Sequence, residues 1–418
     1  MSSSSSSPKH DVTLSLSLPS SPTINDVLKP QERGVKLIQL LLACANHASS
    51  GNLHHADVSL RQISQLASIT GDSMQRLAAR FASALAARLV KRWPGLYKAL
   101  NNSGPVSCDL DRARSIFTRA FPYTGLAYAI INRALIQAMS GQRAIHVVDL
   151  GSANPKLWVP FIRAIADGPD GPPHLKITCV CRNKEAQERL GLRLVKEAKS
   201  LNMPFEFNSI NVSLRELTLD MLKVQSCEAL AFTSILSLHA LLAEDDRIDT
   251  RFGLSKNNEV KECKKMNEFL EMIKSSGPKT ILLVEQESSN NSSRLVDRFV
   301  EGLHFYSAIF DSIDVAFGGF SCSDRLVLEE MFGKEIENIV AGEGMEREER
   351  HERYMKWAVR FGRLGFRPVR LWYESMEEAQ RIVDAYGPGG FKITSQKGSL
   401  MICWHDRPIY AVSAWTCF

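Results

Sequence analysis

A short loop after a buried strand is the part of the sequence that most resembles a chemical site. It reads Asp149-Leu150-Gly151-Ser152-Ala153-Asn154-Pro155 and follows the apolar run 144–150. Loops of the form D-x-G-x-G-x-G let the backbone approach a nucleotide cofactor such as S-adenosylmethionine. Here Ala153 and Pro155 stand where the second and third glycines would be. Pro155 also lacks a backbone N–H donor, so the loop matches this pattern weakly.

The second strand lacks the other half of such a site. Nucleotide-binding folds place an acidic residue at its end to grip the ribose hydroxyls. The sequence there is Cys181-Arg182-Asn183 and offers no carboxylate. We therefore expect no cofactor, and a divergent S-adenosylmethionine-dependent methyltransferase is the alternative hypothesis.

Other residue sets that could carry catalysis or hold a metal are incomplete. Gly319–Ser323 lacks the last glycine of the hydrolase motif G-x-S-x-G. Cys179-Val180-Cys181 alternates faces along a buried strand, which favours a core pair of cysteines over half of a metal site. His146 and His239 are of a type more often hydrogen-bonded in the core than used as a base. The sequence predicts no catalytic residue and no metal site, and hence a protein that is not an enzyme.

One stretch, residues 343–353, is dense in charge: Glu-Gly-Met-Glu-Arg-Glu-Glu-Arg-His-Glu-Arg. It precedes an amphipathic helix that includes Tyr354, Trp357 and Phe361. Opposite charges three and four residues apart on a helix mostly form a solvated face. The alternative is a polar patch that anchors a neighbouring segment or a partner.

The elements that position these residues fall into two parts. Residues 29–143 are predicted to form an all-helical cap of about five helices. Its clearest helix follows the candidate caps Asp72 and Ser73, and its apolar stripe runs through Leu77, Phe81 and Leu85. The heptads are not sustained, so these leucine-rich stripes favour an internal core over an intermolecular zipper.

Positive charge is concentrated in this cap. Residues 71–143 hold 11 Lys or Arg and 3 Asp or Glu, whereas the whole chain holds 51 and 46 and has a net charge of +5. The net charge of the whole chain is too small for a general polyanion binder. Because positive charge is concentrated in the cap, direct DNA binding through the cap is a second alternative hypothesis. Helical arginines also commonly lie in water or pair with carboxylates. The candidate DNA-binding residues are Arg76, Arg80, Arg88, Lys91, Arg92, Arg112 and Arg114.

From residue 144 onwards the pattern changes to strands that alternate with helices. This alternation predicts an α/β fold with a doubly wound, parallel sheet. The last three apolar runs, 391–396, 400–404 and 409–415, are joined by short turns and should pair antiparallel at one edge. Residues 144–418 are therefore predicted to form a Rossmann-like, methyltransferase-like core with an antiparallel C-terminal hairpin.

Residues 1–28 are rich in Ser and Pro and predict a disordered tail. Within them, Leu14, Leu16 and Leu18 alternate with Ser, which suits an extended peptide that docks in a groove, although chance clustering is equally compatible with the spacing. The 9 cysteines show no paired spacing, which indicates a reducing compartment. No apolar run reaches the roughly 20 residues of a membrane helix, so we expect a soluble protein.

Several segments in this order resemble the GRAS family of plant transcriptional regulators. They are the strand His146-Val147-Val148-Asp149 after a leucine-rich helical region, the stretch 332–352 with Arg347, Arg350, His351 and Glu352, and the ending Ser413-Ala414-Trp415. The segments 28–34 and 93–100 are similar to the scarecrow-like branch. One departure is His304 before Phe305-Tyr306-Ser307, where the family's PFYRE segment begins with Pro.

This resemblance implies a nuclear protein, with the cytoplasm as an additional location left open, that regulates transcription mainly through protein contacts. It also implies a role in gibberellin signalling and development. Family members commonly act with zinc-finger transcription factors that carry the DNA specificity, and with other GRAS proteins as homo- or heterodimers. In plant regulators the L-x-L-x-L pattern recruits TOPLESS-type corepressors, which assigns corepressor binding to Leu14, Leu16 and Leu18.

Overall fold

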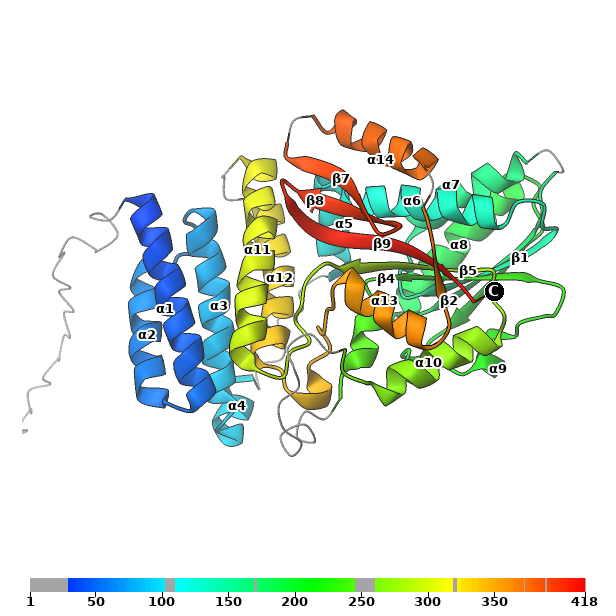
Figure 1. The fold of residues 1–418 in the computed structure, drawn as a ribbon. Coiled ribbons are helices and arrows are strands. Elements are labelled where there is room, and N and C mark those ends of the chain that lie inside the picture. The colour runs from blue at the N-terminus through cyan, green and yellow to red at the C-terminus, as the bar shows by residue number, and fades with distance from the viewer. Residues whose placement is uncertain are drawn as a thin grey trace, which may run out of the picture.

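The computed structural model describes residues 29–101, 110–168, 171–244, 260–318, 322–371, 373–387 and 389–417. A layer of helices stands beside a twisted sheet that has helices on both faces (Figure 1). The tail with Leu14, Leu16 and Leu18 lies outside the described residues, as do Gly319 to Ser321.

The helical layer is built around α3 (Ser73–Val90), which packs against α1 (Pro30–Ser50), α2 (Leu53–Leu66), α11 (Leu295–Phe317) and α12 (Ser323–Ala341). A capping box starts α3: the carboxylate of Asp72 accepts a hydrogen bond from the backbone N–H of Gln75, and the side-chain oxygen of Gln75 accepts one from the N–H of Asp72. Leu77, Phe81 and Leu85 are buried along its length, as their helical spacing predicts.

The helices of residues 29–143 do not form this layer alone. α11 and α12 come from the second half of the chain and lie beside α3, because the apolar surface of α3 extends beyond what α1 and α2 cover (Figure 1). Three further helices complete the N-terminal part: α4 (Pro94–Asn101), α5 (Leu110–Ala120) and α6 (Tyr123–Ala138). α6 packs on α7 (Pro155–Ala166) and on β5 (Thr280–Gln286), and so covers the sheet.

The predicted parallel sheet is confirmed. Its strand order is β3-β2-β1-β4-β5-β9-β8-β7, and the first five strands are parallel. The parallel strands besides β5 are β1 (Ala144–Leu150), β2 (His174–Val180), β3 (Phe205–Ile210) and β4 (Ala229–Ile235).

The antiparallel C-terminal strands lie at one edge, as predicted. β9 (Arg407–Thr416) pairs with β5, and Ser413 lies opposite Leu283. β8 (Ser399–Trp404) and β7 (Phe391–Gln396) follow, and a short β6 (Arg367–Val369) also pairs with β9. This edge completes a mixed sheet of nine strands.

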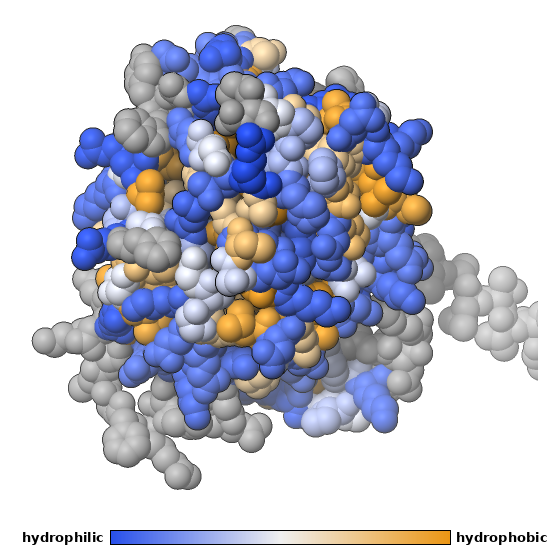
Figure 2. Space-filling view, turned by 90° about the vertical axis from the view of Figure 1, so that its right-hand side faces the viewer, coloured by the Kyte–Doolittle hydropathy of each residue, from blue (hydrophilic) through white to orange (hydrophobic). Residues whose placement is uncertain are grey.

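Helices cover both faces of the sheet. α6, α7, α8 (Lys184–Ser200) and α14 (Tyr373–Ala385) lie on one face, and α10 (Lys264–Ser275) and α13 (Tyr354–Arg363) lie on the other (Figure 1). The short α9 (Leu219–Leu222) precedes β4. On the side turned away from the helical layer, apolar side chains appear as separate groups among hydrophilic ones (Figure 2).

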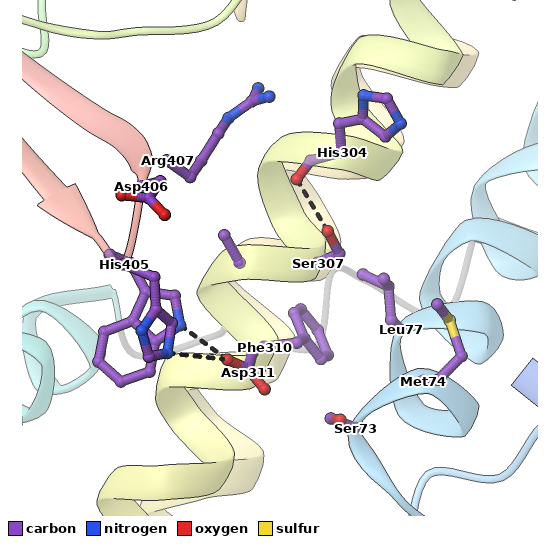
Figure 3. A pocket seen from close by; sticks show the side chains of 12 residues that line it. Ser73, Met74, Leu77, His304, Ser307, Phe310, Asp311, His405, Asp406 and Arg407 are labelled. Atoms are coloured by element: carbon purple, nitrogen blue, oxygen red, sulfur yellow. Dashed lines mark hydrogen bonds and ion pairs between the residues drawn. The ribbon is translucent and has the colours of Figure 1, made fainter. Parts of the chain in front are cut away.

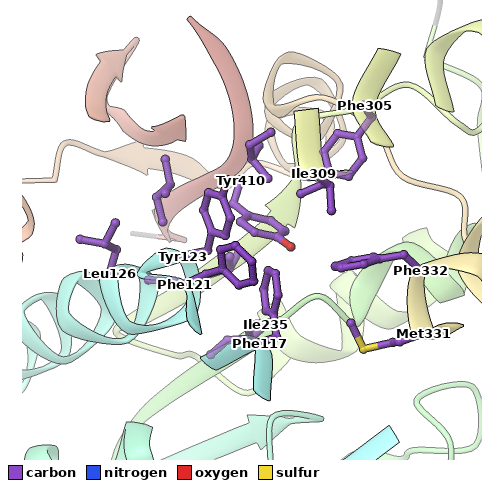
Figure 4. Close-up of a cluster of buried hydrophobic side chains, with 14 of the residues drawn as sticks. Phe117, Phe121, Tyr123, Leu126, Ile235, Phe305, Ile309, Met331, Phe332 and Tyr410 are labelled. Carbon is purple, nitrogen blue, oxygen red and sulfur yellow. The ribbon is translucent and has the colours of Figure 1, made fainter. Parts of the chain in front are cut away.

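Aromatic side chains join the helical layer to the sheet in one core (Figure 4). The ring of Phe117 in α5 lies 5.6 Å from that of Phe332 in α12, and Tyr123 in α6 lies 5.8 Å from Tyr410 in β9. Because these contacts cross both parts, the layer and the sheet fold around shared apolar surface. Among the described helices, none has the length and apolar character needed to cross a membrane.

Candidate functional site

The largest hollow described lies at the carboxyl ends of β1, β2 and β4, where open α/β sheets place their ligands. It has a volume of about 930 Å³. The loop 151–156 forms one wall, Cys181, Arg182 and Asn183 form another, and Leu236 to Leu241 with Glu348 and Glu349 close it. Arg114 and Arg215 also line it. We call it the strand-end pocket.

The carboxylate of Asp149 turns away from this pocket and into its own loop. It accepts hydrogen bonds from the backbone N–H of Ser152 at 2.8 Å and of Ala153 at 3.1 Å, and from the indole of Trp158 at 2.8 Å. Burial raises the pKa of Asp149, and the hydrogen bonds from Ser152 and Trp158 oppose that shift. Asp149 therefore holds the loop in shape instead of facing a ligand.

The loop keeps its first glycine, Gly151, and has a left-handed backbone at the second glycine position although an alanine stands there. Ala153 has φ +41°, a left-handed conformation that glycine adopts at little cost. Asn154 caps α7 through the N–H of Lys156, and Pro155 is its first residue. The loop thus presents a methyl group and a proline ring at the two altered positions.

The wall from β2 carries no carboxylate, as the sequence indicates. The side chain of Arg182 is 67% exposed, and Asn183 caps α8 by accepting a hydrogen bond from the N–H of Ala186. Cys179 is buried in the core, and the half-buried Cys181 packs against the same core and also lines the pocket. The geometry leaves the ribose-binding role of an acidic side chain unfilled at this strand.

At the floor of the pocket, His239 lies on the short helix η2 (Leu238–Leu242) after β4. Its Nδ1 is 2.8 Å from Oε2 of Glu285 at the end of β5, and its Nε2 is 3.4 Å from Oε2 of Glu349. Burial alone would lower the pKa of His239, but the carboxylates of Glu285 and Glu349 outweigh it and raise that pKa to about 10. His239 is thus a hydrogen-bonded core histidine, as predicted, although it also reaches the pocket.

The charged stretch is not a solvated helix, so that interpretation was wrong. Residues 347–353 are irregular, and Arg347, Arg350, His351 and Glu352 are each at most 2% exposed. Glu352 forms two hydrogen bonds with Arg360 of α13, at 2.7 and 2.9 Å. The interpretation failed because the charged side chains pair with residues of other segments. The spacing of charges within one segment does not reveal such partners. The alternative, a polar patch that anchors neighbouring segments, describes the structure.

A family model of the GRAS domain matches residues 37–416. The chain belongs to the GRAS family. It is 40% identical to scarecrow-like protein 3 of Arabidopsis thaliana, over 93% of this chain and 90% of that protein. It is 33% identical to the DELLA protein RGL1 of Arabidopsis thaliana, over 93% of this chain and 71% of that protein.

A crystal structure of SCL7 from Oryza sativa is similar to this one, with a TM-score of 0.77 and 28% identity over 91% of this chain and 99% of that one. The resemblance to the family and the predicted fold class are confirmed. As a GRAS protein, the chain is a plant transcriptional regulator of the class that includes the DELLA proteins of gibberellin signalling.

The family motifs of this GRAS protein lie in different places. His146, Val147 and Val148 are buried in β1, and His146 contacts Glu228 at 3.0 Å and Thr178 at 2.8 Å. The terminal motif lies in β9, where the indole N–H of Trp415 donates to the hydroxyl of Ser413 at 3.0 Å and Ala414 pairs with Leu282. Only Asp149 and the stretch with Arg347, Arg350, His351 and Glu352 lie near the strand-end pocket.

The candidate DNA-binding residues of the GRAS protein are largely engaged within the chain. Arg76 pairs with Glu329 and Asp314, and Arg80 pairs with Glu330. Arg88 pairs with Glu343, and Lys91 pairs with Glu346. Arg92 donates to the carbonyl of Ala48, and Arg112 pairs with Asp324. Arg114 is exposed and lines the strand-end pocket.

A second hollow of about 540 Å³ lies between α3, α11 and the turn from β8 to β9 (Figure 3). Asp311 of α11 accepts a hydrogen bond from the indole of Trp404 at 2.7 Å, and His405 lies beside it. The hydroxyl of Ser307 donates to the carbonyl of His304 in its own helix. These polar groups form hydrogen bonds within the protein, where the helical layer meets the sheet. The strand-end pocket is therefore the better candidate site.

Sequence reasoning missed two residues of this site, Glu285 and Arg215, and singled out Glu349 only as part of the charged stretch 343–353. Glu285 did carry a signal, because it is an acidic residue at the carboxyl end of an apolar strand. Arg215 donates to the backbone carbonyls of Ala240 and Leu241, a tertiary contact with no sequence signature.

Proposed function

We propose that this GRAS protein is a nuclear, non-enzymatic coregulator of transcription in gibberellin signalling and development. It acts through protein contacts, and zinc-finger transcription factors supply the DNA specificity. The observation that supports the non-enzymatic role is the state of the loop 149–155 beside the strand-end pocket. Asp149 is bound to its own loop and Pro155 replaces a backbone donor, so the contacts that a nucleotide cofactor needs are absent from the described loop.

Direct DNA binding through the helical layer is the competing proposal, and the ion pairs of the layer weigh against it. A phosphate contact must compete with carboxylates that already hold Arg76, Arg80 and Arg88. Binding of a random duplex that weakens steeply with salt, and that Arg112→Ala with Arg114→Ala abolishes, would favour direct DNA contact instead.

Two kinds of assembly follow from the same proposal. The helical layer supports association with itself or with other GRAS proteins, and its outermost helices α1 and α2 offer exposed apolar groups such as Val35, which is 56% exposed. Leu14, Leu16 and Leu18 recruit a TOPLESS-type corepressor as an extended peptide.

Calorimetric titration of the full chain with S-adenosylmethionine tests the non-enzymatic role. We expect no saturable heat, and saturable binding would overturn the proposal in favour of a divergent methyltransferase. Capture by a TOPLESS-type domain tests the tail in parallel, with a variant in which Leu14, Leu16 and Leu18 are alanine. Capture that depends on the leucines supports corepressor recruitment, and equal capture of both proteins contradicts it.

A further inference from the structure

Four titratable side chains from three separate segments meet at the floor of the strand-end pocket. His239 comes from η2, Glu285 from the end of β5, and Glu349 and His351 from the irregular charged stretch. The two imidazole rings lie 4.1 Å apart. His239, His351 and Glu285 are buried, whereas the side chain of Glu349 is 26% exposed and lines the pocket.

The two histidines present the same atoms in the same directions. Their Nε2 atoms face Oε2 of Glu349, at 3.4 Å from His239 and 2.8 Å from His351. Their Nδ1 atoms face Oε2 of Glu285, at 2.8 and 4.0 Å. One carboxylate therefore lies on the pocket side of both rings and the other lies behind them.

This arrangement matches the ligand set of a metal ion. One ligand atom each from His239, Glu349 and His351 lies within 4.8 Å of the others. A tetrahedral zinc ion with bonds of about 2.0–2.1 Å separates its ligand atoms by about 3.3 Å. Glu285 takes the position of the carboxylate that commonly accepts a hydrogen bond from the other nitrogen of a metal-bound histidine.

The ring nitrogens of His351 make no well-aligned hydrogen bond in the described part of the chain, although carboxylates face both of them. His351 is 1% exposed, and neither of its ring nitrogens makes a hydrogen bond within the described part of the chain. The approach of its Nε2 to Glu349 at 2.8 Å lacks hydrogen-bond geometry. Buried polar groups normally make well-aligned hydrogen bonds, and a cation bound by both this nitrogen and the Glu349 carboxylate would satisfy the two groups together.

We propose that Nε2 of His239, Nε2 of His351 and a carboxylate oxygen of Glu349 bind one divalent transition-metal ion of the zinc class. Two imidazoles and a carboxylate without a thiolate form the set that zinc accepts with three protein ligands. The fourth position faces the strand-end pocket, where Glu349 is exposed. The ion links the charged stretch to the ends of β4 and β5, so this GRAS protein carries a metal centre in addition to its regulatory role.

The test uses the full chain without a histidine tag, after dialysis against a chelator. Zinc is then titrated in competition with a chromophoric chelator, and bound zinc is counted by mass spectrometry. We expect one tight site per chain. His351→Gln and Glu349→Gln should weaken it at least about 100-fold, and Glu285→Gln should weaken it about 10- to 100-fold because it acts through His239. Cobalt bound to the wild-type chain should show the visible absorption of a tetrahedral site.

Two control variants separate this site from adventitious binding. His55→Gln disrupts the exposed group of His47, His54 and His55 on α1 and α2, whose rings lie 5.2 to 5.6 Å apart. His146→Gln removes a buried histidine that does not line the pocket and contacts Glu228 and Thr178 instead. Both should keep the tight site. Circular dichroism identifies variants that fail to fold, and for these the cobalt spectrum of the wild-type chain decides.

Three results would overturn the proposal: no stoichiometric zinc in the wild-type chain, a cobalt spectrum without tetrahedral bands, or zinc that is lost in His55→Gln and kept in His351→Gln. The last result would mean that zinc binds only to the histidines on α1 and α2. The two histidines would then be held by Glu285 and Glu349 alone. None of these results bears on cofactor or corepressor binding, so the proposed function is tested separately.

Discussion

The guanidinium of Arg76 in α3 donates from Nε to Oε1 of Glu329 in α12 at 2.8 Å, and each side chain is 1% exposed. The two residues are 253 positions apart in the sequence. Arg76 also pairs with Asp314 of α11 at 2.7 Å. This buried pair joins the N-terminal helices to the two helices that come from the second half of the chain.

Arg76→Met should destabilise the protein by about 3–5 kcal/mol, because it leaves the carboxylate of Glu329 buried without its main partner. Arg80→Met is the matched control on the same helix. Its partner Glu330 is 46% exposed, so we expect a loss of about 1 kcal/mol or less. Unfolding in urea measures both. Equal losses in the two variants would show that the Arg76 pair does not hold the layer together.

Protonation of His146 should make stability fall in weak acid. Burial and the charge of Lys176 lower the pKa of His146 to about 4, although Glu228 opposes the shift, whereas an unfolded histidine has a pKa of about 6.5. The unfolded chain therefore binds more protons below pH 6.5, and the contribution of neutral His146 is lost as the pH falls.

Between pH 7.5 and 5.5 this loss should be about 1.4 kcal/mol. Urea unfolding of the wild-type chain and of His146→Gln at both pH values measures this loss. The free energy of unfolding of the variant should fall by about 1.4 kcal/mol less than that of the wild-type chain. The same loss in both proteins would mean that His146 titrates normally in the folded state.

Trp415 of the terminal motif should be important for stability. Its ring stacks on Phe361 of α13 at 4.7 Å, and the side chain is 1% exposed. Trp415→Ala should cost about 3–5 kcal/mol through the cavity that it leaves. Trp93, which is 48% exposed, provides the comparison, and Trp93→Ala should change stability by less than about 1 kcal/mol. Thermal and urea unfolding would refute this prediction if the two alanine variants behaved alike.

Ala153→Gly should stabilise the pocket loop. At φ +41° the Cβ of alanine is strained, and glycine removes that strain at the cost of a more flexible unfolded chain. We expect a net gain of up to about 1 kcal/mol in the free energy of unfolding. Ala186→Gly in the first turn of α8 should instead lose about 0.5–1 kcal/mol. A loss in both variants would indicate that residue 153 is not strained.

The sequence by itself determined the fold class, the order of the strands along the chain and the altered cofactor loop. These depend on local patterns: a buried strand such as 144–150 is mostly apolar, and Pro155 after a capping Asn favours the first turn of a helix. The histidines at 146 and 239 were correctly assigned to the core for the same kind of reason.

Only the tertiary structure decided where the charges lie and what they contact. Residues 343–353 looked like a solvated helical face because their spacing allows pairing along one helix, yet Glu352 pairs with Arg360 and Arg76 pairs with a residue 253 positions away. His239 and Glu285 likewise meet because the parallel strands β4 and β5 end at one edge of the sheet, and the irregular stretch 347–353 brings Glu349 and His351 to them. Which charged residues pair depends on their proximity in space and on their burial. The spacing of residues along the sequence gives neither of these.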